Sequence, residues 1–174
     1  MNVEQYTDKG SGIMNEDVLL VAEPMFGVFD GVTSFDKYAD PDGRTGGLIA
    51  ATLTRDAFAR APKNLRAAAL EANASIEQNM QHRNIQTERM EKRWGTAAAV
   101  IRLHAETVEW LRIADCSIHF LYDNGRVTTI ADDAAIHKDS LRACVQYAKS
   151  KTPAYWDKLL PMLKQNRYRA NRDF

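Results

Sequence analysis

Two short apolar runs near the N-terminus constrain the fold most strongly. Residues 17–22 (DVLLVA) and 25–30 (MFGVFD) are rich in Val, Leu and Phe, and only Glu23-Pro24 separates them. Runs of this length around a Pro-containing break predict two strands joined by a tight turn. Antiparallel pairing would bring the start of the first strand beside the end of the second.

Acidic residues stand at those outer ends of the two predicted strands. Asn15-Glu16-Asp17 enters the first strand and Asp30-Gly31 leaves the second. Converging carboxylates repel one another and resist desolvation, so such a cluster indicates a cation, and oxygen ligands favour Mg²⁺ or Mn²⁺. Alternatively each is an ordinary turn or capping residue, since Asp before Gly is a common turn pair. The joint pattern, which includes Asp115, favours the cation.

The remaining patterns predict a single α+β domain over residues 1–174. Apolar residues at helical spacing predict helices over 47–61 and about 64–82, interrupted at Pro62, after a polar loop over 33–46. Strand patterns follow at residues 96–103, 107–114, 117–122 and 126–130, with Asn124-Gly125 as a hairpin turn, and they predict an antiparallel meander. Helical patterns return after Asp133. Sheets and helices segregated in this way are typical of α+β domains.

Composition bears on partners and compartment. Lys plus Arg total 23 and Asp plus Glu total 23, so the balance gives no support to a nucleic-acid or membrane partner. Cys116 and Cys144 lack a metal-ligand or disulfide-framework spacing and are expected to be free thiols. No signal-like start or bilayer-length apolar run is present in the sequence, and a cytoplasmic location is favoured.

Seven short motifs, taken in order, resemble the motif series of the type 2C (PPM) metal-dependent serine/threonine protein phosphatases. The resemblance covers about residues 6–135 and leaves 136–174 as a helical remainder. It implies an antiparallel β-sandwich flanked by helices in α-β-β-α layers, incomplete at the C-terminus. The motifs are Asp8-Lys9-Gly10, Asn15-Glu16-Asp17, Val28-Phe29-Asp30-Gly31, Gly46-Gly47, Gly95-Thr96-Ala97, Ile113-Ala114-Asp115 and Asp123-Asn124-Gly125.

The resemblance also implies roles for individual residues. Asp30 would bridge two Mg²⁺ or Mn²⁺ ions, Glu16 and the Gly31 carbonyl would hold the second ion, and Asp17 would orient a bound water. Asp30 and Asp17 are thus the expected catalytic residues. Asp115 matches the aspartate that holds a third, weaker ion in bacterial members. Gly95 and Thr96 are expected to let a strand start close to the site.

The implied activity is hydrolysis of phosphoserine or phosphothreonine in a phosphorylated protein substrate, by a water that bridges two ions. Such dephosphorylation belongs to signalling, with a cognate serine/threonine kinase as the opposing enzyme. Two other functions stay open. One is a pseudophosphatase or regulatory binding module that retains the fold, and the other is a small-molecule phosphomonoesterase.

The chain departs from the family pattern at several positions. Gly12 stands where the family has a phosphate-clamping arginine, Val32 stands where some members have a histidine, and the Gly-Asp-Ser-Arg signature becomes Ala114-Asp115-Cys116-Ser117. Two further metal-binding aspartates of the family have no counterpart after Asp133, because Asp139 and Asp157 lie in helix-like contexts and Asp173 is next to the end. We therefore expect a fragment or a shortened form with half of the metal site.

Other reactive or aromatic residues are given structural interpretations. The four histidines have no ligand spacing, and the carboxylate of Asp115 would disfavour a Cys116 thiolate. The tryptophans are expected to anchor the core, and the basic C-terminal residues to form a solvated helix face. These residues are His82, His104, His119 and His137, then Trp94, Trp110 and Trp156, and finally Lys164, Arg167, Arg169 and Arg172.

Overall fold

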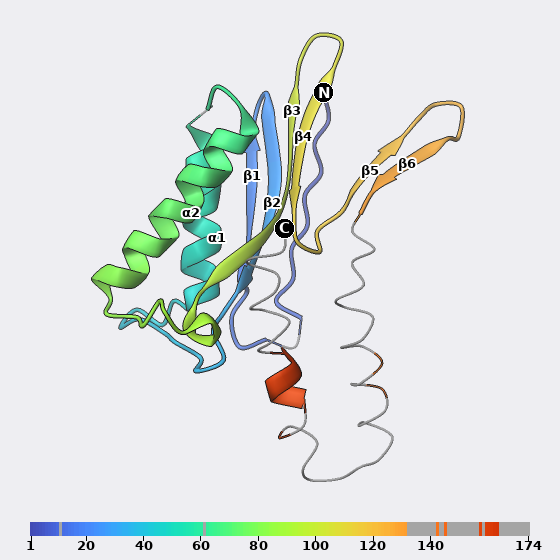
Figure 1. Cartoon of the computed structure of the whole chain (residues 1–174). Helices are drawn as coiled ribbons and strands as arrows, with labels where there is room; N and C mark the ends of the chain where they lie inside the picture. The colour runs from blue at the N-terminus through green and yellow to red at the C-terminus, as the bar shows by residue number, and fades with distance from the viewer. Residues whose placement is uncertain are drawn as a thin grey trace.

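An antiparallel sheet of four strands is the centre of the fold (Figure 1). The computed structural model describes residues 1–10, 12–60 and 62–131, together with 142, 145, 157 and 159–163. The predicted hairpin is formed by β1 (Asp17–Ala22) and β2 (Met25–Val32). Next to β2 lies β3 (Gly95–Leu103), followed by β4 (Val108–Ile113). The register pairs Asp17 with Asp30, so the expected meeting of the two strand ends is confirmed.

Two helices cover one face of this sheet. They are α1 (Gly46–Ala59) and α2 (Leu65–His82), close to the predicted ranges. Thr45 caps α1 by accepting a 3.2 Å hydrogen bond from the Leu48 backbone N–H, and Asn64 caps α2 in the same way. Such a cap contributes about 1 kcal/mol, so each helix begins where a capping side chain is available.

The core fills the space between the helices and the sheet. Phe29 of β2 and Phe58 of α1 are fully buried, with ring centroids 5.8 Å apart. Burying one such side chain contributes about 1.5–3 kcal/mol, so this pair is a main attachment of α1 to the sheet. The same cluster contains Leu20, Met25, Ala51, Leu65, Ala68, Ala98 and Val100. A second cluster around Trp94 joins Ile49 and Ala50 of α1 to Ile76 and Met80 of α2.

The predicted four-strand meander is wrong at its middle. Strands β5 (Ile118–Leu121) and β6 (Val127–Ile130) pair with each other in a separate two-stranded sheet, away from β4. Ala114, directly after β4, has a φ of 58°, in the left-handed region. A residue in that region ends an extended strand. The chain therefore leaves the first sheet before Asp115 and forms the projecting hairpin in Figure 1.

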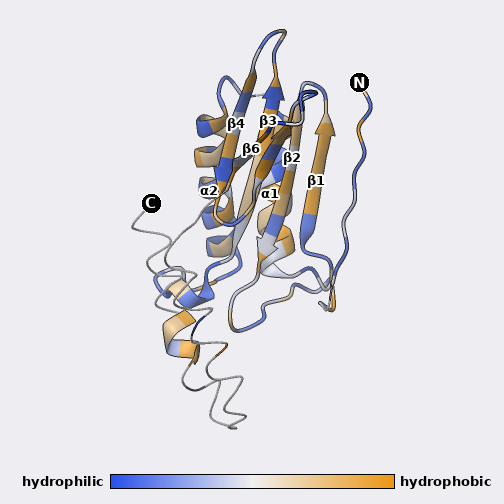
Figure 2. Cartoon of the chain, turned by 90° about the vertical axis from the view of Figure 1, so that its right-hand side faces the viewer, coloured by the Kyte–Doolittle hydropathy of each residue, from blue (hydrophilic) through white to orange (hydrophobic). Residues whose placement is uncertain are grey.

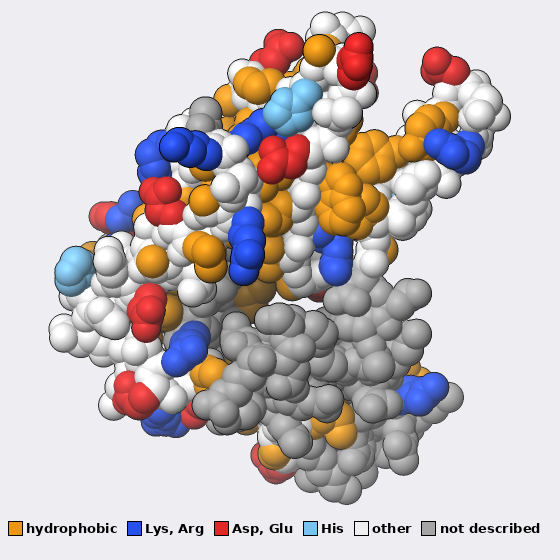
Figure 3. Space-filling view, turned by 45° about the horizontal axis from the view of Figure 1, so that its top comes forward, with side chains coloured by type: hydrophobic (Ala, Val, Ile, Leu, Met, Phe, Trp, Pro, Cys, Tyr) orange, Lys and Arg blue, Asp and Glu red, His pale blue; other side chains and the backbone are white. Residues whose placement is uncertain are grey.

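The outer face of the sheet, opposite the helices, is apolar and partly exposed (Figure 2). Val21, Val28 and Trp110 are 49%, 45% and 46% exposed. Figure 3 shows hydrophobic side chains at the surface between the sheet and the β5–β6 hairpin. The expectation that tryptophans anchor the core is confirmed for Trp94, which is 5% exposed, and is wrong for Trp110, because that residue lies on the outer face.

The α+β class with antiparallel sheets and helices is confirmed. Within the described ranges, one helical layer and the four-stranded sheet are seen, together with the β5–β6 hairpin. Most of the predicted C-terminal helical region, with Asp139, Trp156 and Asp173, lies outside the described residues. The helices that the structure does describe include none with the length and apolar character needed to cross a membrane.

Candidate metal centre

Four acidic residues stand near one end of the sheet, with Asp17 and Asp30 on its outer face and Glu16 against the start of α1. Asp17 and Asp30 are register partners on β1 and β2, Glu16 directly precedes β1, and Asp115 follows β4. The pKa of Asp30 is raised above its ordinary value of 3.8, first by burial of part of the carboxylate and then by the negative charges of Asp17, Asp115 and Glu16. Negative charges that raise the pKa of Asp30 must lie near its carboxylate. The acidic residues predicted as a cluster are thus brought together by three strand ends.

The donor chemistry of this cluster suits a hard divalent cation. All four side chains offer carboxylate oxygens, and the Gly31 carbonyl at the end of β2 adds another oxygen. Among the described residues, however, no group of three or more His, Cys, Asp and Glu side chains has the arrangement to hold one ion. The described residues therefore offer suitable ligand atoms, but these atoms do not surround one position as a complete ligand shell of an ion would.

Glu16 is the most precisely held of the four acids. Its Oε1 accepts a 2.6 Å hydrogen bond from the Thr33 hydroxyl, and its backbone carbonyl accepts one from the Gly31 N–H at 3.2 Å. The same Thr33 hydroxyl accepts a 2.9 Å hydrogen bond from the Gly47 N–H in the first turn of α1. Two strands and the start of a helix therefore meet at this carboxylate.

Gly47 leaves the space that the Glu16 carboxylate occupies. A Cβ on Gly47 would lie 2.3 Å from Glu16 Oε2, and a Cβ on Gly31 would lie 2.5 Å from the Gly47 backbone. Both approaches are shorter than real Cβ contacts allow. The Gly46-Gly47 pair was recognised in the sequence as a motif. Thr33, by contrast, was missed because it lies in a loop where no periodicity or spacing marks it.

Thr96 and Gly95 were expected to let β3 start near the site. The Thr96 hydroxyl donates a 2.9 Å hydrogen bond to the Asp30 carbonyl, which fastens β3 to the strand end that carries Asp30. A Cβ on Gly95 would meet nothing within 4 Å. The close start of β3 is therefore not explained by the missing side chain of Gly95.

Cys116 lies beside the acidic cluster and is half-buried. Burial, followed by the charges of Asp115 and Asp30, raises the pKa of its thiol to about 11. The thiol is therefore neutral near pH 7, and a neutral thiol is a poor nucleophile. This agrees with the sequence-based interpretation that Cys116 is not a nucleophile.

Arg112 is a cation on the face that carries Asp17 and Asp30. The register pairs Val28 with Ala99 and Ala99 with Arg112. Alternate residues of a strand share a face, so Arg112 and Asp30 lie on the same face, in neighbouring rows. Its guanidinium donates to the Ala114 carbonyl, toward Asp115. Arg112 is not identifiable from the sequence, because only strand pairing places it on the same face as Asp17 and Asp30.

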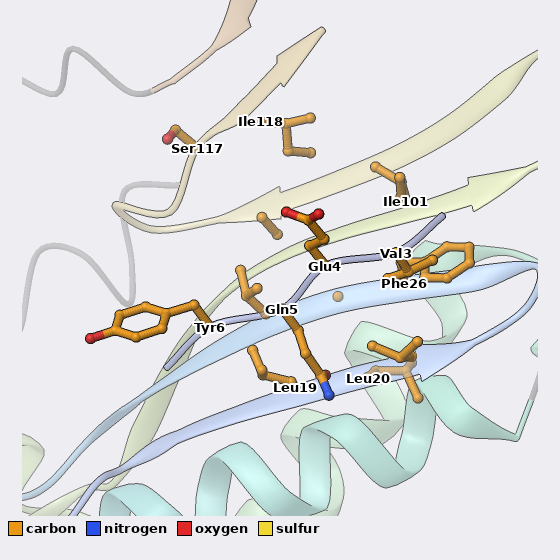
Figure 4. A pocket seen from close by; sticks show the side chains of 14 residues that line it. Val3, Glu4, Gln5, Tyr6, Leu19, Leu20, Phe26, Ile101, Ser117 and Ile118 are labelled. Carbon is orange, nitrogen blue, oxygen red and sulfur yellow. The ribbon is translucent and has the colours of Figure 1, made fainter. Parts of the chain in front are cut away.

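A groove of about 300 Å³ lies elsewhere on the outer face (Figure 4). Its walls come from the N-terminal segment Val3–Tyr6, from Leu19 and Phe26 of the hairpin, and from Ile118. Glu16, Asp17, Asp30 and Asp115 are not among its lining residues. The acidic cluster is thus an open surface site beside an apolar groove.

The described histidines fit structural positions. His119, on β5, contacts the Ser117 and Thr129 hydroxyls at 3.0 Å each, so both ring nitrogens have neighbours on the hairpin. His82 and His104 are exposed. His137 lies outside the described residues.

No family model matches the sequence, and no curated protein matches it. Two similar solved structures are phosphatases. The serine/threonine phosphatase PstP/Ppp of Mycobacterium tuberculosis aligns with a TM-score of 0.61 and 20% identity, over 79% of this chain and 56% of that chain. The catalytic domain of PstP in complex with two manganese ions aligns with a TM-score of 0.60 and 22% identity, over 76% of this chain and 56% of that chain.

These alignments show the fold. The resemblance to the type 2C phosphatases that the motifs indicated is confirmed at that level, because the structural neighbours are serine/threonine phosphatases. The chain spans little more than half the length of these neighbours.

Proposed function

We propose that the chain carries the catalytic half-site of a metal-dependent phosphatase that acts on phosphoserine or phosphothreonine in proteins. The observation that supports this most directly is the electrostatics of Asp30. Its pKa is raised, and beside partial burial the causes are three further carboxylates from separate parts of the chain. Titratable groups whose pKa is shifted by burial and by neighbouring charges are more frequent at functional sites. A fold shared with two solved structures of the phosphatase PstP, one of them in complex with manganese, makes a divalent cation the preferred ligand of this cluster.

Each residue of the acidic cluster has a separate proposed role. Asp30, Glu16 and the Gly31 carbonyl would hold the cations, with Asp115 at the periphery. Asp17, exposed and opposite Asp30, would accept a hydrogen bond from the attacking water and orient it. When bound, two divalent ions would activate that water and offset the charge of the phosphate. Because the cluster is open to solvent, a phosphorylated side chain on another protein can reach it.

Arg112 is the proposed phosphate contact in place of the missing arginine at Gly12. A guanidinium presents its donors in a planar fork that matches two oxygens of a phosphate. Arg112 lies in the row next to Asp30, on the same face. This position would orient the substrate phosphate toward the acidic cluster.

Hydrolysis of a chromogenic phosphate ester and of a phosphothreonine peptide, with Mn²⁺ and with a chelator, tests the proposal. We expect turnover only with Mn²⁺ and a loss of about 100-fold or more in Asp30→Asn, because a metal ligand is removed. Arg112→Ala should raise KM about tenfold while kcat changes less, since a charge-assisted hydrogen bond contributes about 1.5–3 kcal/mol. Asp123→Asn, in the exposed β5–β6 turn, serves as the matched control.

Two results would contradict the proposal. Turnover that persists in the chelator would rule out a metal-dependent reaction. The absence of Mn²⁺-dependent turnover in the unchanged chain would show that this chain does not carry the activity. Hydrolysis of the ester without hydrolysis of the peptide would instead redirect the substrate assignment to small phosphomonoesters.

A further inference from the structure

Thr33 connects the start of α1 to the Glu16 carboxylate. It follows β2 directly, and its side chain is partly buried. Its hydroxyl accepts a hydrogen bond from the Gly47 N–H at 2.9 Å and donates one to Glu16 Oε1 at 2.6 Å. A hydroxyl has a single proton. Donation to Glu16 therefore fixes the direction in which the Thr33 proton points.

The helix strengthens this link. The Gly47 N–H belongs to the first turn of α1, where backbone N–H groups lack partners within the helix and carry the positive end of the helix dipole. An N–H that donates to a hydroxyl polarises it and makes it a better donor to the next acceptor. The 2.6 Å distance to Glu16 is in the range of a charge-assisted O–H···O⁻ hydrogen bond.

The surrounding backbone restricts the other carboxylate oxygen. A Cβ on Gly47 would come within 2.3 Å of Glu16 Oε2, which shows how closely this oxygen lies against the helix start. The Gly31 N–H also holds the Glu16 backbone at 3.2 Å. With Oε1 held by Thr33 and Oε2 against Gly47, the plane of the carboxylate is set by its neighbours.

We propose that Thr33 is a positioning residue for divalent-cation binding and acts through Glu16. The inference rests on the proposed function, since it takes Glu16 as a metal ligand. Groups that hydrogen-bond to a metal ligand orient it and raise its affinity for the ion, and their removal costs about 10–100-fold in metal affinity. Thr33 has this relation to Glu16, and its own orientation comes from α1.

Calorimetric titration with Mn²⁺ tests this assignment on four forms of the whole chain. Thr33→Val removes the hydroxyl and retains the shape, so we expect Mn²⁺ affinity to fall by about tenfold or more. Thr33→Ser retains the hydroxyl and should bind Mn²⁺ like the unchanged chain. Thr45→Ala removes the α1 cap, whose oxygen accepts from the Leu48 N–H. It should lower the melting temperature and leave Mn²⁺ affinity unchanged, which separates positioning of Glu16 from stability of the helix.

The outcomes distinguish this inference from the proposed function. Equal Mn²⁺ affinity in the unchanged chain and in Thr33→Val would overturn the positioning assignment alone. Equal losses in Thr33→Val and Thr45→Ala would also overturn it, since helix stability would then be the cause. No Mn²⁺ binding by the unchanged chain would overturn the proposed function and this inference with it. If Thr33→Val does not fold, Thr33→Ala, which adds no atoms, replaces it and is judged by the same comparison.

Discussion

Asp30 opposes the stability of the metal-free chain. Its pKa in the folded state is raised above the ordinary value of 3.8, by burial and by the neighbouring carboxylates. The folded chain therefore binds more protons than the unfolded chain between these two pKa values, and stability falls as pH rises through that window. At neutral pH the ionised Asp30 carboxylate lowers the stability by the full amount, and below pH 3.8 this loss of stability is absent.

Asp30→Asn should consequently raise the melting temperature of the metal-free protein near neutral pH. The gain should disappear at about pH 3, where the aspartate is protonated in both states. Thermal unfolding in a chelator at the two pH values measures the difference, with Asp123→Asn as the control for loss of an exposed charge. Equal melting temperatures of Asp30→Asn and the unchanged chain at neutral pH would show that the carboxylate repulsion is too weak to matter.

The residues of the site differ in how far the sequence could predict them. Asp17 and Asp30 were placed together because hairpin pairing follows from two apolar runs and the break between them. Thr33 and Arg112 could not be placed, since their relation to the acids comes from contacts between distant elements. The role of Gly47 depends on the position of Glu16 Oε2, and the spacing of glycines in the sequence does not predict that position.

The loop over 33–46, between β2 and α1, is organised by a buried aspartate. The Asp40 side chain is 1% exposed and accepts hydrogen bonds from the backbone N–H groups of Asp42 and Arg44 and from the Arg44 Nε. Arg83 of the α2 C-cap approaches it at 3.6 Å. Sequence reasoning treated this stretch as a polar loop, because its hydrogen bonds are not visible in composition.

Asp40→Asn should lower the melting temperature at neutral pH and have less effect in acid. Burial alone would raise the pKa of Asp40, but the Arg44 hydrogen bonds and charge, with the Asp42 N–H, place it below 3.8. The ionised Asp40 carboxylate therefore stabilises the fold above pH 3.8, and this stabilisation is lost as pH falls through the lower pKa of Asp40 in the folded state. Thermal unfolding across this pH range measures it.

Asp42→Asn is the matched control in the same loop. Its side chain is 75% exposed and contacts Arg44 at 3.1 Å. Exposed ion pairs contribute little to stability, so this variant should melt close to the unchanged chain. Equal effects of Asp40→Asn and Asp42→Asn would contradict the structural role of the buried carboxylate.

Strands and helices were predictable as elements, whereas one pairing was not. The helix ranges follow from apolar spacing and from capping residues, and each strand lies within two residues of a predicted run. The predicted pairing that is wrong is that of β4 with β5. Whether consecutive strands share a sheet depends on the residues between them. Ala114 has a left-handed φ, which is rare for alanine and cannot be predicted from the sequence.

At the scale of the whole molecule, the sheet has one packed and one open face. Val100 on the helix side is completely buried, while Val28 on the outer face of the neighbouring strand is 45% exposed. The open face carries Asp17 and Asp30 at one end and the apolar groove beside them. The chain spans 56% of the chain in each of the two PstP structures to which it is similar.

A matched pair of substitutions tests which face is the core. Val100→Thr places a hydroxyl in an apolar interior and should lower the free energy of unfolding by about 1–3 kcal/mol. Val28→Thr should change it by about 0.5 kcal/mol or less, as is usual at exposed positions. Urea unfolding gives both values. A larger loss for Val28→Thr would mean that the outer face is covered in solution.

Binding of Mn²⁺ near neutral pH tests whether the strand ends of β1, β2 and β4 form the proposed divalent-cation site. Electron paramagnetic resonance counts free Mn²⁺ during titration of the unchanged chain and of Asp30→Asn, with Asp123→Asn as the control. We expect saturable binding by the unchanged chain and by the control, and loss of binding in Asp30→Asn. Binding that is equal in all three forms, or absent from the unchanged chain, would contradict the proposed site.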